Sequence, residues 1–144
     1  MIIYGLFHLT LIYKLKTKQM KNVKQIGIWM DHSNAFFMEQ PDENTIHRMI
    51  TSKFTHQEKE SSLSKNENLM HNKEQQLQSS YFNKIADIIK NYQEVLLFGP
   101  TDAKSELLNL LKKDHLFDAI KFQVKQSDKM TEKQMNEFVT AHFK

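Results

Sequence analysis

An uninterrupted apolar run in the second half of the chain constrains the fold more than any other feature. Residues 95–98 read VLLF and are followed at once by Gly99 and Pro100. A short run with no polar position is typical of a strand buried on both faces, because a half-exposed strand would alternate apolar and polar residues. Such a strand needs packed layers above and below it, so the chain is predicted to form a central sheet covered by helices.

Alternating residues predict an antiparallel meander in the first half. Residues 25–30 alternate with the period of a strand. The turn formers at 31–34 and the apolar residues 35–39 that follow them are typical of a hairpin. A second turn at 40–44 leads into a third predicted strand at 45–50. The first half is therefore expected to supply three antiparallel strands.

The second half alternates helix and strand signals. Apolar residues at helical spacing predict a helix that starts at the capping residues 79–80. A second helix is predicted after Gly99-Pro100, with Lys104 on its outward side. Residues 120–124 alternate as a fifth strand. Thr131 and Gln134 form a capping-box pattern ahead of a third helix.

This order predicts an α/β fold: a mixed five-stranded sheet, built from a three-strand antiparallel meander plus strand–helix–strand units, with about three helices. It is the topology of ribonuclease H-like domains, although other α/β sheets share the same order of elements. The chain of 144 residues has the length of one domain. We assign it to residues 20–144 and interpret residues 1–19 as an accessory or mis-assigned extension.

Residues 51–78 are dominated by Ser, Asn, Gln, Lys and Glu, and their apolar residues are too sparse for a buried face. This stretch is predicted to be one long polar loop, which exceeds the usual length of a connection inside a compact domain. Its lysines and glutamates balance each other, so it carries no patch of one sign. Such a loop is either functional or disordered.

The net charge of +3 comes from the start of the chain. Residues 1–25 hold five lysines and no acid, which leaves 15 of the 20 basic residues against all 17 acidic ones, a net charge of −2. The body therefore has no excess positive field that would steer it toward a polyanion. The apolar stretch at residues 1–13 is shorter than the roughly 20 residues of a membrane-spanning helix and lacks the pattern of a secretory signal, so we predict neither membrane insertion nor export.

The chain has no cysteine, which excludes disulfides, thiolate zinc sites, iron–sulfur clusters and a cysteine nucleophile. This composition is consistent with a cytoplasmic protein. None of the seven histidines forms a compact ligand spacing with another, so no metal site and no cofactor are predicted.

Two stretches are similar to a known family. Residues 26–35, IGIWMDHSNA, resemble the opening hairpin of the central domain of the eukaryotic and archaeal class 1 peptide-chain release factor and of Pelota. They are more similar still to stand-alone bacterial relatives of that domain, in which a strand, an Asp-His turn and an Ala recur. Residues 95–107 resemble the later strand–Gly–helix segment of the domain, in which a Lys lies early in the helix. The resemblance covers most of residues 21–144.

The resemblance implies a ribonuclease H-like fold and a connection with translation. In release factors the central domain carries a Gly-Gly-Gln loop that helps water to cleave the peptidyl-tRNA ester. Here glycine occurs only at positions 5, 27 and 99, so the counterpart loop at 51–78 cannot contain that motif. We therefore expect a non-catalytic protein that binds the ribosome or a translation factor and uses the 51–78 loop as its reaching element.

The residues after the buried strand are candidates for an anion or RNA site. Gly99, Thr101 and Lys104 stand at a helix start, where exposed N–H groups attract phosphate and a lysine adds charge. Ordinary helix capping by Thr101 or Asp102 is the competing interpretation. His32, in the turn that resembles the family, is a further candidate, and its substitution is expected to change mainly stability.

A Mg²⁺-dependent nuclease is the alternative from the enzyme class. Asp31 and Asp102 both follow predicted strands, and ribonuclease H-like nucleases gather carboxylates around two metal ions. Asp31 is equally what a hairpin turn prefers, because its side chain bonds to nearby backbone N–H groups. The candidates for a third ligand are Glu39, Glu74 and Asp87.

Two further interpretations concern surfaces. Trp29, Phe36 and Phe37 could stack on bases, as aromatic residues do in RNA-binding sheets, but a sheet between helices needs such residues for its core. A small homo-oligomer that pairs through an exposed strand is the third possible function.

Overall fold

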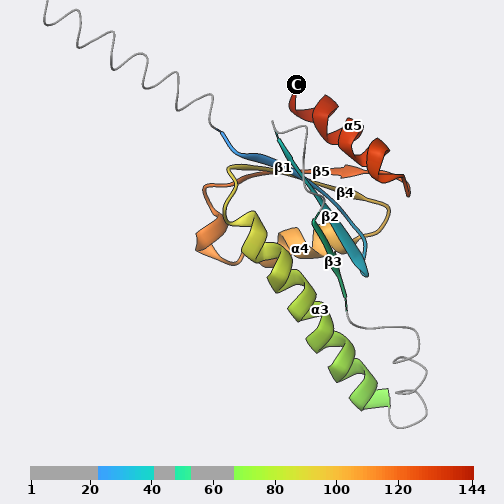
Figure 1. Ribbon diagram of the computed structural model, residues 1–144. Helices are drawn as coiled ribbons and strands as arrows, with labels where there is room; N and C mark the ends of the chain where they lie inside the picture. Colours follow the sequence, from blue (N-terminus) through green and yellow to red (C-terminus); the bar gives the residue numbers. More distant parts are fainter. Residues whose placement is uncertain (1–22, 41–47, 53–66) are drawn as a thin grey trace, which may run out of the picture.

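The computed structural model describes residues 23–40, 48–52 and 67–144. Five strands form one sheet, and three α-helices and a short 3₁₀-helix pack around it (Figure 1). The strands are β1 (Gln25–Met30), β2 (Asn34–Gln40), β3 (Arg48–Thr51), β4 (Glu94–Gly99) and β5 (Lys121–Gln126). The helices are α3 (Glu67–Ile89), α4 (Ala103–Leu111), η1 (His115–Phe117) and α5 (Glu132–Phe143).

The strand order is β3-β2-β1-β4-β5. β1 pairs antiparallel with β2, and β2 with β3, whereas β1 pairs parallel with β4, and β4 with β5. The predicted mixed five-stranded α/β sheet with three helices is therefore confirmed. β1 has the predicted bounds, and β3 ends at Thr51, one residue later than predicted.

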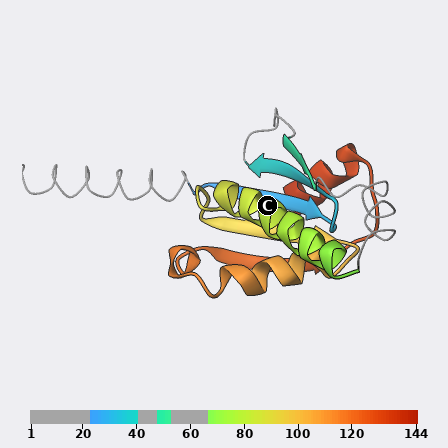
Figure 2. The same cartoon turned by 90° about the horizontal axis from the view of Figure 1, so that it is seen from below.

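Helices cover both faces of the sheet. α3 and α4 pack on one face, where Ile28 and Leu97 meet apolar residues of both helices (Figure 2). α5 packs on the other face, where Met135 and Val139 contact the cluster around Leu96 and Phe98. Side chains of β4 therefore point into both layers, and its residues 95–98 are at most 1% exposed, which confirms the prediction of a fully buried strand.

The start of α5 matches the predicted capping box. The Thr131 hydroxyl accepts a hydrogen bond from the Gln134 N–H at 3.2 Å, and the Gln134 side chain accepts one from the Thr131 N–H at 3.0 Å. Both bonds satisfy donors that would otherwise lack a partner at the helix start. Among the helices that the structure describes, none combines the length and the apolar character that crossing a membrane requires.

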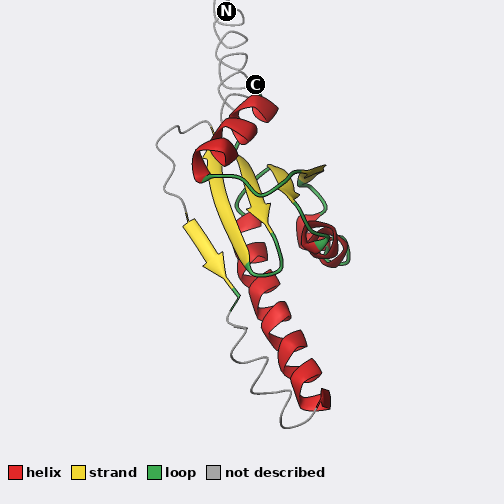
Figure 3. Cartoon of the chain, turned by 90° about the vertical axis from the view of Figure 1, so that its right-hand side faces the viewer, coloured by secondary structure: helices red, strands yellow, loops and turns green. Residues whose placement is uncertain are grey.

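The predicted loop at 51–78 is wrong over residues 67–78, because α3 begins at Glu67. Ser79 and Ser80, predicted as caps, lie in the middle of this helix. Apolar periodicity reports only the part of a helix that packs on a core. At about 1.5 Å per residue α3 is roughly 34 Å long, against about 20 Å for a six-residue strand. Its amino-terminal half consequently projects beyond the sheet and needs no apolar stripe (Figure 3).

Three other sequence-based predictions lie wholly or partly outside the described residues. They are the extension at residues 1–19, the second turn with the start of the third strand at residues 41–47, and the part of the polar loop at residues 53–66.

Candidate functional site

The predicted site residues gather at one edge of the sheet. The parallel strands β1, β4 and β5 run in the same direction, so their carboxyl ends lie together. Each of the main candidates ends β4, follows β1 or β4, or lies in the first turn of α4. They are Asp31, His32, Gly99, Thr101, Asp102 and Lys104.

Gly99 allows the strand ends to approach closely. Its φ is +149°, a conformation that residues with a Cβ rarely adopt, and a Cβ built there would overlap the carbonyl group of Met30. The Gly99 carbonyl accepts a hydrogen bond from the N–H of Ser127 at 3.2 Å. One glycine thus brings the end of β1, the end of β4 and the segment after β5 into contact.

Lys104 is buried, and its predicted outward orientation is wrong. The residue is only 4% exposed, and its Nζ donates hydrogen bonds to the Thr101 carbonyl at 2.6 Å and to Gln126 Oε1 at 2.9 Å. The amide of Gln126 donates in turn to the Pro100 carbonyl at 3.1 Å. The ammonium group can be buried because protein oxygens replace the water around it. Lys104 therefore ties the turn after β4 to β5 and directs its charge at the protein.

Asp31 serves the hairpin turn. Its Oδ1 accepts hydrogen bonds from the N–H groups of Ser33 at 2.8 Å and Asn34 at 2.6 Å. The Asp31 carbonyl accepts a third bond from the Tyr81 hydroxyl at 2.9 Å. Burial, assisted by the negative charge of Asp31, raises the pKa of Tyr81 far above its usual value, so the hydroxyl stays protonated and able to donate. These bonds fasten the end of β1 to α3.

The start of α4 is capped by neighbouring groups. The Thr101 hydroxyl accepts a hydrogen bond from the Ala103 N–H at 3.3 Å, whereas the Asp102 side chain makes no capping bond. In the same turn, Glu106 Oε2 lies 3.1 Å from His32 Nε2, and these side chains are 52% and 44% exposed. This surface pair links the β1–β2 turn to α4 and contributes little free energy, because solvent screens it.

The described residues do not bring together the carboxylates that the nuclease alternative needs. Within residues 23–40, 48–52 and 67–144, no group of three or more His, Asp or Glu side chains is close enough to hold a metal ion. Glu39 pairs with Ile26, at the opposite end of β1 from Asp31, and Asp87 forms an ion pair with Lys90 at 3.5 Å. Glu74 lies in the amino-terminal half of α3.

Trp29 belongs to the core beneath α5. It is 5% exposed, its ring meets that of Phe36 edge to face at 5.8 Å, and its Nε1 donates to the Asp128 carbonyl at 3.4 Å. The indole is therefore covered by protein, which favours the core interpretation over base stacking.

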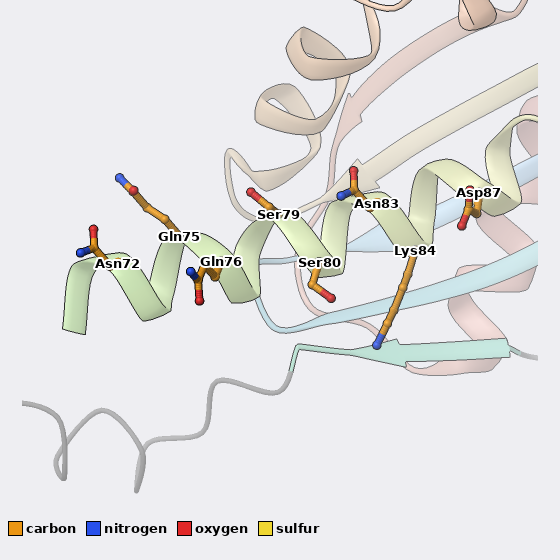
Figure 4. Close-up of a pocket in the computed structure, with 8 residues that line it drawn as sticks. All are labelled: Asn72, Gln75, Gln76, Ser79, Ser80, Asn83, Lys84 and Asp87. Carbon is orange, nitrogen blue, oxygen red and sulfur yellow. The ribbon is translucent and has the colours of Figure 1, made fainter. Parts of the chain in front are cut away.

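A polar face of α3 is a surface that the sequence-based prediction missed, because residues 67–78 were interpreted as loop. It borders a shallow depression of about 720 Å³ (Figure 4). Gln76, Ser80 and Lys84 point toward β3, whereas Gln75, Ser79 and Asn83 point away from it. The signal that could have found this face is amide and hydroxyl side chains three and four residues apart, which is helical spacing. The lining residues are Asn72, Gln75, Gln76, Ser79, Ser80, Asn83, Lys84 and Asp87.

Comparison with solved structures bears on the fold. No protein-family model and no curated protein matches this chain. Pelota of Archaeoglobus fulgidus matches 92% of the chain with a TM-score of 0.55 and 10% sequence identity. Pelota of Thermoplasma acidophilum matches 82% of it with a TM-score of 0.48 and 16% identity. The chain covers 35% and 32% of these proteins, about a third of each. The Archaeoglobus match shows a Pelota-like fold, in agreement with the family resemblance in the sequence.

Proposed function

We propose that this protein is a non-catalytic, translation-associated protein that binds the ribosome or a translation component. The proposal rests on the family resemblance in the two sequence segments and on the Pelota-like fold. The observation that carries it is the polar amino-terminal half of α3, which projects beyond the sheet as a preformed reaching element. Because one fold can support many functions, the proposal needs a direct binding test.

The chemistry of α3 suits contact with another polar macromolecule. An amide side chain both donates and accepts hydrogen bonds, and Gln75 and Gln76 are exposed in the projecting half. Lys84 and Asp87 offset each other on the same face. Recognition through this surface would therefore depend on hydrogen bonds more than on net charge.

A non-catalytic role agrees with the state of the candidate groups. Glycine is restricted to positions 5, 27 and 99, which excludes a Gly-Gly-Gln motif. The carboxylate of Asp31 accepts two backbone hydrogen bonds, and the ammonium of Lys104 bonds two protein oxygens. These groups are engaged in holding the strand ends together.

Sedimentation of the tagged full-length chain from lysates of growing and starved cells tests the proposal. We expect the protein to migrate with ribosomes or their subunits in at least one growth state. Gln75→Ala together with Gln76→Ala should reduce this fraction without unfolding α3, because alanine favours helix. Ser105→Ala with Asn109→Ala, on the exposed side of α4, is the matched control and should leave sedimentation unchanged.

Protein found only in the free fraction under every growth state would refute ribosome binding. Capture of a translation factor by the wild-type chain, lost with the α3 variant and kept with the α4 variant, would instead identify the other partner class. Light scattering on the free protein separates both results from a homo-oligomer formed through the edge strand β5.

A further inference from the structure

A second polar depression lies on the α5-covered face and extends along β5 from Lys121, at the amino end of the strand, to Lys125. It has a volume of about 510 Å³, within the range of small-ligand sites. β5 forms its floor, and the last turn of α5 forms one wall. We call it the notch and define it by six lining residues: Glu94, Lys121, Gln123, Lys125, His142 and Phe143.

The register of β5 aims two lysines into the notch. Lys121 and Lys125 pair with Glu94 and Phe98 of β4, and Phe98 faces α5. Since alternate residues of a strand share a face, both lysines lie on the α5 side. Lys125 Nζ is 5.9 Å from the centre of the Phe138 ring, a cation–π contact. Neither lysine forms an ion pair with a carboxylate of the described residues, so both charges are available to an anion.

Two aromatic side chains and one carboxylate also line the notch. His142 and Phe143 meet edge to face with their ring centres 4.8 Å apart. Burial and then the charge of Lys125 lower the pKa of His142, while Glu94 opposes them, so the imidazole is neutral at pH 7. Glu94 Oε2 accepts a hydrogen bond from the Gln25 amide at 2.7 Å. Two ammonium groups thus face one carboxylate, and the notch keeps a local excess of positive charge.

We propose that the notch binds one nucleotide unit of single-stranded RNA, with its phosphates at Lys121 and Lys125 and its base against the rings of Phe143 and His142. Phe143 and His142 are partly exposed. Cations beside an accessible aromatic ring suit single-stranded nucleic acid, because the backbone needs charge and the unpaired base needs a flat apolar partner. The Glu94 carboxylate can accept hydrogen bonds from base amino groups or ribose hydroxyls. This inference deepens the proposed function by naming RNA as the component that the protein contacts. The link between RNA binding and translation rests on the proposed function.

Fluorescence anisotropy with a short labelled single-stranded RNA tests the notch directly. We expect Lys121→Gln with Lys125→Gln to weaken binding about tenfold, and to reduce the slope of log affinity against log salt concentration by about 1.4, since each phosphate contact on a single strand contributes about 0.7. Lys129→Gln with Lys133→Gln removes the same charge near the opposite end of α5 and should change affinity less than about twofold.

Phe143→Leu keeps an apolar side chain but removes the ring, and it should weaken binding about fivefold or more. Circular dichroism confirms that each variant is folded. Three results would overturn the proposal: no RNA binding by the wild-type chain, equal losses in the two lysine variants, or full affinity in Phe143→Leu. Equal losses would show that the RNA responds to overall charge only.

The two proposals fail in different ways. If the wild-type chain sediments with ribosomes and does not bind the free RNA, the notch is refuted and the proposed function stands. If it binds RNA through the notch, stays in the free fraction of the lysate and captures no translation factor, the proposed function is refuted and the notch stands.

Discussion

The contact between α5 and β1 allows a quantitative test of how the notch wall is positioned. Gly27 lies on β1 beneath α5, and a Cβ built there would overlap the side chain of Val139. Its φ is not positive, so the backbone itself accepts alanine. Val139 is fully buried, and its branched side chain has little rotamer freedom with which to move aside. Gly27→Ala should therefore push α5 away from the sheet.

The magnitudes follow from packing. Overpacking by one methyl group costs about 1–3 kcal/mol, which is the expected loss for Gly27→Ala. Val139→Ala removes two buried methyl groups at about 0.8 kcal/mol each and leaves a small cavity, for a loss of about 2–3 kcal/mol. Independent sites would give a double variant destabilised by about 3–6 kcal/mol. Because the new Cβ at position 27 fills the space vacated at position 139, we expect only about 2–3 kcal/mol, a coupling of about 1–3 kcal/mol.

Urea unfolding followed by circular dichroism gives the free energy of unfolding for the wild type, the two single variants and the double variant. A second readout is RNA affinity, which should fall in Gly27→Ala and recover in the double variant, because α5 carries His142 and Phe143. Strictly additive losses, or a stable Gly27→Ala protein, would refute the close packing of Val139 on Gly27 and with it the position of the notch wall.

Three further predictions concern single residues. Asp31→Ala should lower the free energy of unfolding by about 1–3 kcal/mol. Asp31→Asn should lower it by less, because an amide oxygen can still accept the two backbone hydrogen bonds. An unchanged urea midpoint in Asp31→Ala would show that the carboxylate does not support the turn. Gly99→Ala should cost about 3 kcal/mol or more, measured by the same unfolding assay, because it combines strain at positive φ with overlap on the Met30 carbonyl, and a stable variant would contradict this close approach. The pKa of His142 is lowered in the folded state, so the contribution of His142 to stability is complete above the unfolded pKa of about 6.5 and is lost as the pH falls below that value. His142→Gln should therefore flatten the dependence of the urea midpoint on pH in that window. An unaltered pH profile would contradict the lowered pKa.

The elements that the sequence predicts well are those encoded locally. β1 has the predicted bounds because its alternation is complete within six residues, and the cap of α5 depends only on Thr131 and Gln134. The amino-terminal half of α3 was missed for the opposite reason. A helix that projects beyond its sheet has no core to pack against, so residues 67–78 lack the apolar stripe by which buried helices are recognised.

The candidate site depends on distant parts of the chain, and sequence spacing cannot reveal it. The orientation of Lys104 is decided by Gln126, which lies 22 residues later. The notch combines the edge strand β5 with the last turn of α5. A net charge of −2 over residues 26–144 predicts no attraction to a polyanion. This sum does not show where charges lie, and so it misses two lysines in one depression that form no ion pair with a carboxylate of the described residues.

The connections between the strands explain why the two ends of the sheet differ. In open α/β sheets, ligands bind at the carboxyl ends of strands where consecutive crossover helices pass to opposite faces and leave a crevice between them. Here β1, β4 and β5 follow one another in a single direction across the sheet, so right-handed crossovers place α3 and α4 on the same face. At the carboxyl edge the polar groups of Lys104, Gln126 and the turn after β4 bond to one another. Among the described helices, α5 alone packs on the other face, and its last turn lies beside β5. Lys121 at the amino end of β5 and Lys125 near its carboxyl end form no ion pair with a carboxylate of the described residues. The topology therefore places these two cations along the α5-covered face of β5, and not in a crevice at the carboxyl edge of the sheet.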